Sequence, residues 1–389
     1  MTFLPPRPTC AFGAYCSTLT LLVVIGVLIV SGLPAQSQHR PGVSPAPRAE
    51  VTEATTESVG PNGRYHLTWR TTPEVPVSVY VSGHPSAAPD QMLRLATAID
   101  ETDYEATVPD SIARPYFLIQ PDGKGTGRRT ATRVLPLDGG RNFRDLGGYA
   151  AANGKRVKWG RIFRSGVLAN LTDADYDYLA DLGIEVICDF RSSEERTNET
   201  TNWRGGSAPK IISWGYSNSR GESERLFQGD LTAEKMRGVM IELYTKIAYE
   251  HADKYATMFR HLADGRTPLL FHCSAGKDRA GTGAALLLTA LGVDRKTVIQ
   301  DYAMSDDVVD YEEAFSEELR KAREQGGLMA ALAELPSEVR APLFRSDPAY
   351  IKSMFAELEA NHGSVDGFIK TEMDIDEETL DRMRTRLLE

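Results

Sequence analysis

The sequence is built around the stretch Leu269-Leu270-Phe271-His272-Cys273-Ser274-Ala275-Gly276-Lys277-Asp278-Arg279-Ala280-Gly281-Thr282-Gly283. Its apolar run ends at His272, a short loop follows, and residues 284–291 have the composition of a helix that Gly292 closes. A strand, a tight loop and a helix N-terminus form an anion-binding unit, because the loop amides and the positive end of the helix dipole converge on one point. The stretch therefore predicts an anion site.

Cys273 and Arg279 bracket this loop with five residues between them. A helix N-terminus with adjacent cations favours the thiolate form of a cysteine, which makes Cys273 a candidate nucleophile. The planar guanidinium of Arg279 matches two oxygens of a phosphoryl group. Attack would give a cysteinyl-phosphate that water hydrolyses. A buried core thiol is the alternative for Cys273, but the surrounding strand, His272 and helix favour the catalytic interpretation.

Residues 272–281 resemble the phosphate loop of the protein tyrosine phosphatase superfamily, in the version of the atypical bacterial, secreted protein tyrosine phosphatase B-like enzymes. Four more stretches match that family in order: residues 142–149 (NFRDLGGY), 163–166 (FRSG), 189–192 (DFRS) and 363–368 (GSVDGF). The resemblance covers about residues 135–389. It implies an α/β fold with a central, mostly parallel sheet flanked by helices, and hydrolysis of phosphotyrosine, with phosphoserine, phosphothreonine and phosphoinositide monoesters left open.

The resemblance also assigns site residues. Phosphate would bind to the loop residues Ser274, Ala275, Gly276, Lys277, Asp278 and Arg279, with Cys273, Arg279 and Asp278 catalytic. No Trp-Pro-Asp triplet is present, so Asp278 is the leading candidate for the general acid, followed by Asp189 and Asp230. Asp278 could instead accept loop amides. A lysine at position 277 widens the expected substrates to phosphoinositides, the alternative being a solvated surface lysine.

One residue departs from the family pattern. The family usually has Thr or Ser after the loop arginine, where the hydroxyl stabilises the leaving thiolate, whereas this chain has Ala280. Thr282 is a candidate substitute. Two other functions therefore stay open, a non-catalytic phosphate-binding module and a sulfurtransferase, although the flanking motifs argue against the latter. His272, Asp189, Arg164 and Thr282 are expected to support the site from behind the residues that touch phosphate.

Composition limits the partners. The 389 residues carry a net charge of −10, so nothing favours nucleic acid, and the expected partner is a phosphorylated protein or phospholipid. His251 and His261 lack metal-ligand spacing, so no metal is expected. No cofactor is expected either, because the thiolate supplies the attack.

The N-terminal segment predicts export. Residues 1–38 contain an almost wholly apolar run, typical of a signal peptide or of a membrane anchor that would tie the protein to a membrane. Either way, the rest of the chain would lie outside the cytoplasm, in the periplasm or the medium. Beyond the leader, only Cys188 and Cys273 remain, so a regulatory disulfide is open, although a buried core thiol is favoured for Cys188.

The remaining chain divides into three parts. Residues 39–60, rich in Pro, Ser and Thr, are expected to be a linker. Residues 61–135 carry short alternating patterns, with a last strand at 132–135, and predict a small all-β sandwich that resembles a fibronectin type III module. Residues 136–389 are expected to form the catalytic domain, with a polar loop at 215–229, a lid of helices in the C-terminal region and a final pair of helices around Gly363.

Overall fold

A computed structural model describes residues 48–60, 63–123, 125–204, 206–216, 230–325 and 328–389. Residues 47–389 belong to one compact unit. The predicted leader at 1–38, the first part of the predicted linker and most of the predicted polar loop at 215–229 therefore lie outside the described residues. Within the described part of the chain, no helix is both long and apolar enough to cross a membrane.

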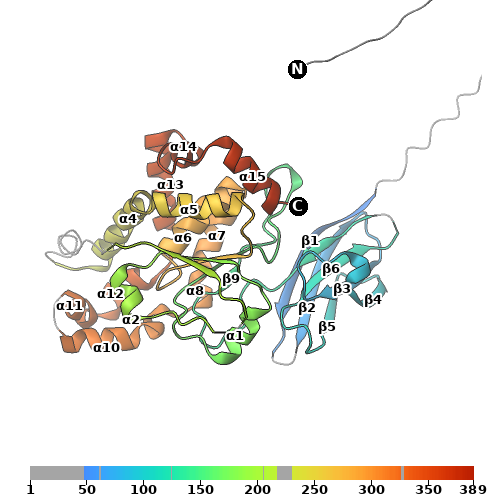
Figure 1. The fold of residues 1–389 in the computed structure, drawn as a ribbon, viewed down its shortest axis with the longest axis horizontal. Helices are drawn as coiled ribbons and strands as arrows, with labels where there is room; N and C mark the ends of the chain where they lie inside the picture. Colours follow the sequence, from blue (N-terminus) through green and yellow to red (C-terminus); the bar gives the residue numbers. More distant parts are fainter. Residues whose placement is uncertain (1–47, 61–62, 124, 205, 217–229, 326–327) are drawn as a thin grey trace, which may run out of the picture. The chain divides into compact units, whose positions relative to one another are not determined.

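Two sheets of mostly antiparallel strands come first in the chain, and among the described residues only β1 and β7 pair in parallel there (Figure 1). One has the strand order β5-β2-β1-β7 and the other β4-β3-β6-β8. The bounds are β1 Ala49–Ser58, β2 Arg64–Thr72, β3 Val77–Ser82, β4 Leu93–Ile99, β5 Asp103–Thr107, β6 Tyr116–Pro121, β7 Gly125–Thr126 and β8 Arg128–Thr130. Both sheets contribute to one apolar core, formed by Val51, Leu67, Trp69, Val77, Val79, Val81, Ala106, Val108, Phe117 and Ile119.

Two sequence predictions about this region are wrong. The linker predicted at 39–60 contains β1, which pairs with β2 along most of its length. Composition hid this strand, since Pro and Ser before position 49 suggest a linker, whereas Val51 and the alternating Thr and Glu residues after it have strand character. The last strand, predicted at 132–135, is instead β8, and Val134 makes only an isolated bridge to Arg144.

A third, five-stranded sheet has the order β12-β11-β13-β10-β9. Its strands are β9 Arg144–Asp145, β10 Ile162–Ser165, β11 Val186–Asp189, β12 Lys210–Ser213 and β13 Leu269–His272. All neighbours pair in parallel except β9, which is antiparallel to β10. The register sets Asp189 and Ser165 beside His272, so three strands end together just before Cys273. The α/β class predicted from the sequence is confirmed.

Helices account for most of the remaining described chain. They are α1 Asp173–Ala180, α2 Ser193–Asn198, α4 Ala233–Glu250, α5 Ala252–Ala263, α6 Arg279–Ala290, α7 Arg295–Ala303, α8 Ser305–Val308, α9 Tyr311–Ala314, α10 Ser316–Gln325, α11 Leu328–Glu334, α12 Ser337–Phe344, α13 Pro348–His362, α14 Val365–Thr371 and α15 Glu377–Leu387. Helix α13 packs on α4, and α15 packs on α5 (Figure 1). Helix α6 is almost wholly buried in the core that these helices share with the five-stranded sheet.

The C-terminal segment differs from the prediction. Gly363 ends α13 in the left-handed conformation, with φ of 75°, as a glycine after a helix commonly does. Three helices, rather than the predicted pair, follow Asp347, because α14 ends at Thr371 and a short turn separates it from α15.

Candidate active site

The loop between β13 and α6 surrounds the sulfur of Cys273. Cys273 is 1% exposed, and the amide of Gly276 donates a hydrogen bond to its Sγ at 3.2 Å. Gly276 has φ of +78°, and a Cβ placed there would lie 2.5 Å from the backbone nitrogen of Gly166. Only glycine fits this turn without strain. The loop thus places the thiol near the N-terminus of α6, where the helix dipole favours a negative charge.

The guanidinium of Arg279 is held by Glu195. Its NH1 and NH2 donate to Oε2 and Oε1 of Glu195, both at 2.6 Å. Ser274 Oγ donates to the same carboxylate at 3.0 Å. Burial opposes ionisation of Glu195, but Arg279 outweighs it, and the pKa of this carboxyl falls to about 2. Burial likewise opposes the charge of Arg279, yet Glu195 and Cys273 hold the pKa of this arginine well above its ordinary value.

Sequence reasoning missed Glu195. It is the third residue of α2, where it completes a capping box with Ser192 at the end of β11. The spacing of Ser192 and Glu195 is a sequence signal for a helix start. That signal predicts the start of α2. It does not predict the ion pair with Arg279, which lies 84 positions further along the chain.

Aromatic residues complete the surroundings of Arg279. Its NH1 donates to the carbonyl of Phe190 at 3.2 Å and to the hydroxyl of Tyr216 at 3.1 Å. Tyr255 donates its hydroxyl to the Arg279 carbonyl at 2.8 Å. These bonds fix both the backbone and the side chain of Arg279, so its fork has a defined direction relative to Sγ.

Asp278 faces two donors rather than the loop amides. Lys277 Nζ and the hydroxyl of Tyr244 each donate to its Oδ1 at 2.7 Å. The Asp278 side chain is 24% exposed, whereas that of Lys277 is only 3% exposed. Asp278 is the N-cap residue of α6, yet its side chain makes no cap hydrogen bond. A carboxylate and an ammonium group therefore pair within the same loop as the thiol, and Lys277 is not a solvated surface lysine.

Three side chains bind the loop from behind. Asn142 Nδ2 and Arg164 NH2 donate to the Gly276 carbonyl at 3.1 and 2.7 Å, and Tyr311 donates its hydroxyl to the Ala275 carbonyl at 3.1 Å. Their donors fix the orientation of these two loop carbonyls. Arg164 is fully buried, so it lies behind the loop rather than at the edge of a phosphate pocket.

A buried ion cluster lies next to these residues. Asp301 accepts from Arg164 NH1 at 2.7 Å, from Arg144 NH1 at 3.3 Å and from the hydroxyl of Tyr149 at 2.8 Å. Burial lowers the pKa of Arg144 to about 10, although Asp301 opposes the shift. Asp145 instead pairs with Arg114 at 3.2 Å. Arg144 and Asp145, although neighbours in sequence, therefore belong to different ion pairs.

Comparison with known proteins agrees with this geometry. A family model described as the tyrosine phosphatase family matches residues 135–389. The chain belongs to the tyrosine phosphatase family. A candidate tyrosine-protein phosphatase of Cupriavidus necator is 33% identical over 254 residues, which cover 62% of this chain and 85% of that protein.

Two further relatives carry similar names. The triple specificity protein phosphatase PtpB of Mycobacterium tuberculosis is 29% identical over 301 residues, covering 66% of this chain and 99% of that protein. A tyrosine-protein phosphatase of Nostoc commune is 25% identical over 234 residues, covering 58% and 73%. Together with the family match, these similarities identify the chain as a protein-tyrosine phosphatase.

The structure places the other candidate residues of the phosphatase as follows. Arg191 donates from Nε and NH2 to Asp189 at 2.9 and 2.8 Å. Burial acts to raise the pKa of Asp189, but His272 and Arg191 outweigh it, so the pKa of this carboxyl lies below its ordinary value. His272 Nε2 lies 3.6 Å from Asp189 Oδ1, and burial lowers the pKa of His272 to about 4. Thr282 is fully buried in α6, and Asp230 is exposed. Asp189 and His272 therefore form a buried pair beneath the loop, while Asp230 stands apart from these contacts.

Both thiols of the described chain are free and buried. Burial raises the pKa of Cys188 to about 12, so this thiol is protonated at neutral pH. Among the residues that the structure describes, no group of three His, Cys, Asp or Glu side chains could hold a metal ion.

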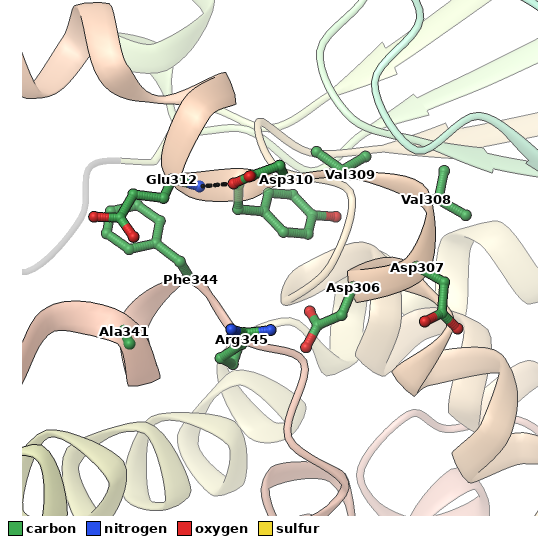
Figure 2. Close-up of a pocket in the computed structure, with 10 residues that line it drawn as sticks. Asp306, Asp307, Val308, Val309, Asp310, Glu312, Ala341, Phe344 and Arg345 are labelled. Carbon is green, nitrogen blue, oxygen red and sulfur yellow. Dashed lines mark hydrogen bonds between the residues drawn. The ribbon is translucent and has the colours of Figure 1, made fainter. Parts of the chain in front are cut away.

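A pocket of about 390 Å³ lies beside α8, α9 and α12 of the phosphatase (Figure 2). Tyr311 lines it together with the acidic residues Asp306, Asp307, Asp310 and Glu312. An acidic lining repels a phosphate dianion, so this pocket is not the phosphate site. Tyr311 nevertheless links it to the loop, because its hydroxyl binds the Ala275 carbonyl.

Proposed function

We propose that this phosphatase hydrolyses phosphotyrosine monoesters through a cysteinyl-phosphate on Cys273. The observation that carries the proposal is one loop in which a buried thiol, the fork of Arg279 and the carboxylate of Asp278 stand together. Arg279 and the loop amides would hold the three non-bridging oxygens of the phosphoryl group, where negative charge develops.

In the first step, Sγ of Cys273 attacks phosphorus as the bond from phosphorus to the phenolic oxygen breaks. Asp278 gives its proton to that oxygen, so tyrosine leaves as a neutral phenol. The carboxyl group suits this role because it is partly exposed, whereas Asp189 is buried and bound by Arg191.

In the second step, water attacks phosphorus and gives a proton to the Asp278 carboxylate. The bond from phosphorus to sulfur breaks, inorganic phosphate leaves, and the thiolate is restored. Ala280 is fully buried and offers no hydroxyl to the departing sulfur. The Gly276 amide is the donor seen on Sγ, so we expect this step to be the slower one.

We also propose a substrate range wider than phosphotyrosine. The Mycobacterium tuberculosis relative is named a triple specificity phosphatase. Lys277 adds a second buried cation beside the thiol and favours highly charged phosphate groups. Phosphoserine, phosphothreonine and phosphoinositide monoesters are therefore proposed as further substrates.

The domain organisation and location are proposals as well. We propose residues 136–389 as the catalytic domain and the two preceding sheets as a fibronectin type III-like sandwich, supported by their shared core. We propose that residues 1–38 direct export or anchor the chain to a membrane, and that helices in the C-terminal region act as a lid. The composition of the leader supports the first of these two proposals.

The test is phosphate release from an aryl phosphate by the full chain and by Cys273→Ser. We expect a burst of phenol followed by steady turnover, and loss of kcat by more than about 10³-fold in the variant, as for other nucleophile removals. Cys188→Ala removes the other buried thiol among the residues that the structure describes and serves as the matched control. Turnover by Cys273→Ser at the rate of the unmodified protein would falsify the proposed nucleophile. A stoichiometric burst without turnover would mean that Ala280 blocks the second step. Phosphate binding without any release of phenol would favour the phosphate-binding module.

A further inference from the structure

The Asp278 carboxylate is held asymmetrically. Both of the donors described above, Lys277 Nζ and the Tyr244 hydroxyl, bind the same oxygen, Oδ1. The two donors occupy the two lone pairs of Oδ1. Oδ2 is therefore the oxygen that can carry the proton of the acid. The geometry therefore distinguishes the two oxygens of the proposed general acid.

Tyr244 is itself held in place. It is completely buried on α4, and the hydroxyl of Tyr302 on α7 donates to its oxygen at 2.7 Å. The Tyr302 bond occupies one lone pair of Tyr244, so the single Tyr244 proton is directed at Asp278. A chain of hydrogen bonds thus runs from α7 through α4 to the N-cap residue of α6.

Both tyrosines remain donors over the whole working range of pH. Burial, and after it the negative charge of Asp278, raise the pKa of Tyr244 and of Tyr302 well above the ordinary value for tyrosine. Neither hydroxyl ionises near neutral pH. Tyr244 can therefore only support Asp278 as a fixed donor and cannot replace it as the acid.

Tyr244 differs from Lys277 in how firmly it is anchored. Lys277 is the chain neighbour of Asp278 and reaches it through a flexible stem, while its Nζ lies 5.9 Å from the centre of the Tyr311 ring. Tyr244 comes from a separate helix, and its ring packs against those of Tyr302 and Tyr350, each at 5.5 Å between centroids. A rigid donor on a separate element fixes the direction of the carboxyl group better than a flexible neighbour does.

We propose that Tyr244 is a positioning residue for the reaction: its hydroxyl orients the Asp278 carboxyl group so that Oδ2 presents the proton to the leaving oxygen. This inference rests on the proposed function, in which Asp278 is the general acid. Tyr244 does not touch the substrate. Its effect must pass through Asp278, which gives a test that a merely structural tyrosine would fail.

The experiment compares Tyr244→Phe with Tyr350→Phe in the full chain. Tyr350 is the matched control, because its ring packs on Tyr244 but its hydroxyl donates to the Pro342 carbonyl instead. Phenyl phosphate has a poor leaving group that needs a proton, whereas p-nitrophenyl phosphate has a good one that does not. The readout is kcat/KM for both substrates, since this quantity reports steps up to cleavage of the bond to the leaving oxygen.

We expect Tyr244→Phe to lower kcat/KM for phenyl phosphate by about tenfold, a part of the roughly 10²–10⁴-fold that general acid catalysis contributes. For p-nitrophenyl phosphate we expect less than about a threefold loss, because this leaving group needs little protonation. Tyr350→Phe should keep kcat/KM for both substrates within about twofold of the unmodified protein, since Tyr350 contacts neither Asp278 nor the loop. Equal losses on both substrates with Tyr244→Phe would overturn the inference.

A second variant separates the inference from the proposed function. In an Asp278→Asn background, Tyr244→Phe should cause no further loss on phenyl phosphate, because the group through which it acts is gone. If the two losses simply add, Tyr244 acts by another route and the inference fails while the function stands. If Asp278→Asn alone leaves kcat/KM for phenyl phosphate unchanged, the acid role of Asp278 itself fails.

Discussion

The phosphate loop has one arginine–carboxylate cluster in front of it and another behind it. In front, Arg279 pairs with Glu195, and the two side chains are 16% and 23% exposed. Behind, Arg144 and Arg164 share Asp301, and no side chain of this cluster is more than 2% exposed. The same ion chemistry therefore occurs in two different environments on either side of one loop.

The difference in exposure separates the arginine that can bind phosphate from the arginines that support the loop. Both NH groups of Arg164 end on acceptors of the protein, namely Asp301 and the Gly276 carbonyl. Arg279 keeps part of its surface open next to Cys273, where a phosphoryl group can add to its contacts. Arginine near a phosphatase loop is thus not in itself a sign of phosphate binding, and exposure decides which role each arginine has.

The largest expected effect comes from breaking the rear cluster with Asp301→Asn. Two buried guanidinium groups would lose their counter-charge, and we expect the free energy of unfolding to fall by about 3–5 kcal/mol, as when one partner of a buried ion pair is removed. Denaturant unfolding measures this loss. Asp307→Asn makes the same chemical change at an exposed position of α8 and should be close to neutral.

If Asp301→Asn instead leaves the unfolding curve unchanged while abolishing turnover, the rear cluster serves catalysis directly, and the division between the two clusters is wrong. If both Asn variants destabilise the protein equally, the loss reflects net charge rather than the rear cluster.

A smaller effect is expected from Glu195→Gln in the front cluster. Both side chains are partly exposed, so water can solvate the guanidinium that loses its partner, and we expect the unfolding free energy to drop by only about 1.5–3 kcal/mol, the range for a hydrogen bond to a charged group. We expect kcat/KM to fall by about tenfold, because Arg279 loses the partner that fixes its fork. Unfolding and steady-state kinetics on the same preparation measure both.

The front cluster also predicts a pH dependence. The pKa of Glu195 is about 2 in the folded chain and 4.5 ordinarily, so its carboxylate stabilises the folded state fully above pH 4.5. This stabilisation disappears as the pH falls from 4.5 towards 2. The free energy of unfolding of Glu195→Gln should therefore change less steeply with pH in that window. An unchanged slope would mean that other carboxyl groups dominate acid unfolding.

The smallest effect is expected from a third cluster on the surface. Arg320 on α10 binds Glu317 and Glu324 at 2.7 and 2.6 Å, but its side chain is 55% exposed. Water screens such pairs, so Arg320→Ala should leave the unfolding midpoint and kcat within experimental error. A clear loss of activity would show that α10 contributes to the site, and the order of the three clusters would no longer follow burial.

The sequence could predict the loop itself because its parts are contiguous. Cys273, Gly276 and Arg279 fall within seven residues, and the strand and helix on either side are marked by composition. The α/β class followed from the same stretch and the motifs around it.

The partners of the loop could not be predicted, because they depend on register and packing. Glu195 reaches Arg279 only since β11 pairs with β13 and delivers α2 to the loop. The sequence pattern predicts Tyr244 as a core position of a helix, and the structure agrees. Its hydroxyl contact with Asp278 could not be predicted, because it depends on the packing of α4 on α6. Strand β1 was missed because proline-rich sequence precedes it.

The bonds that shape the loop also bear on how the chain folds. Asn142 and Arg164 reach the Gly276 carbonyl across 134 and 112 positions of sequence. Closing such long segments loses chain entropy before any contact is gained, so contacts of this kind tend to form late. We therefore expect the thiol pocket to be complete only when these distant segments have met, so a chain in which they are still apart would lack part of the loop's support. We expect such an incompletely folded chain not to hydrolyse phosphate esters.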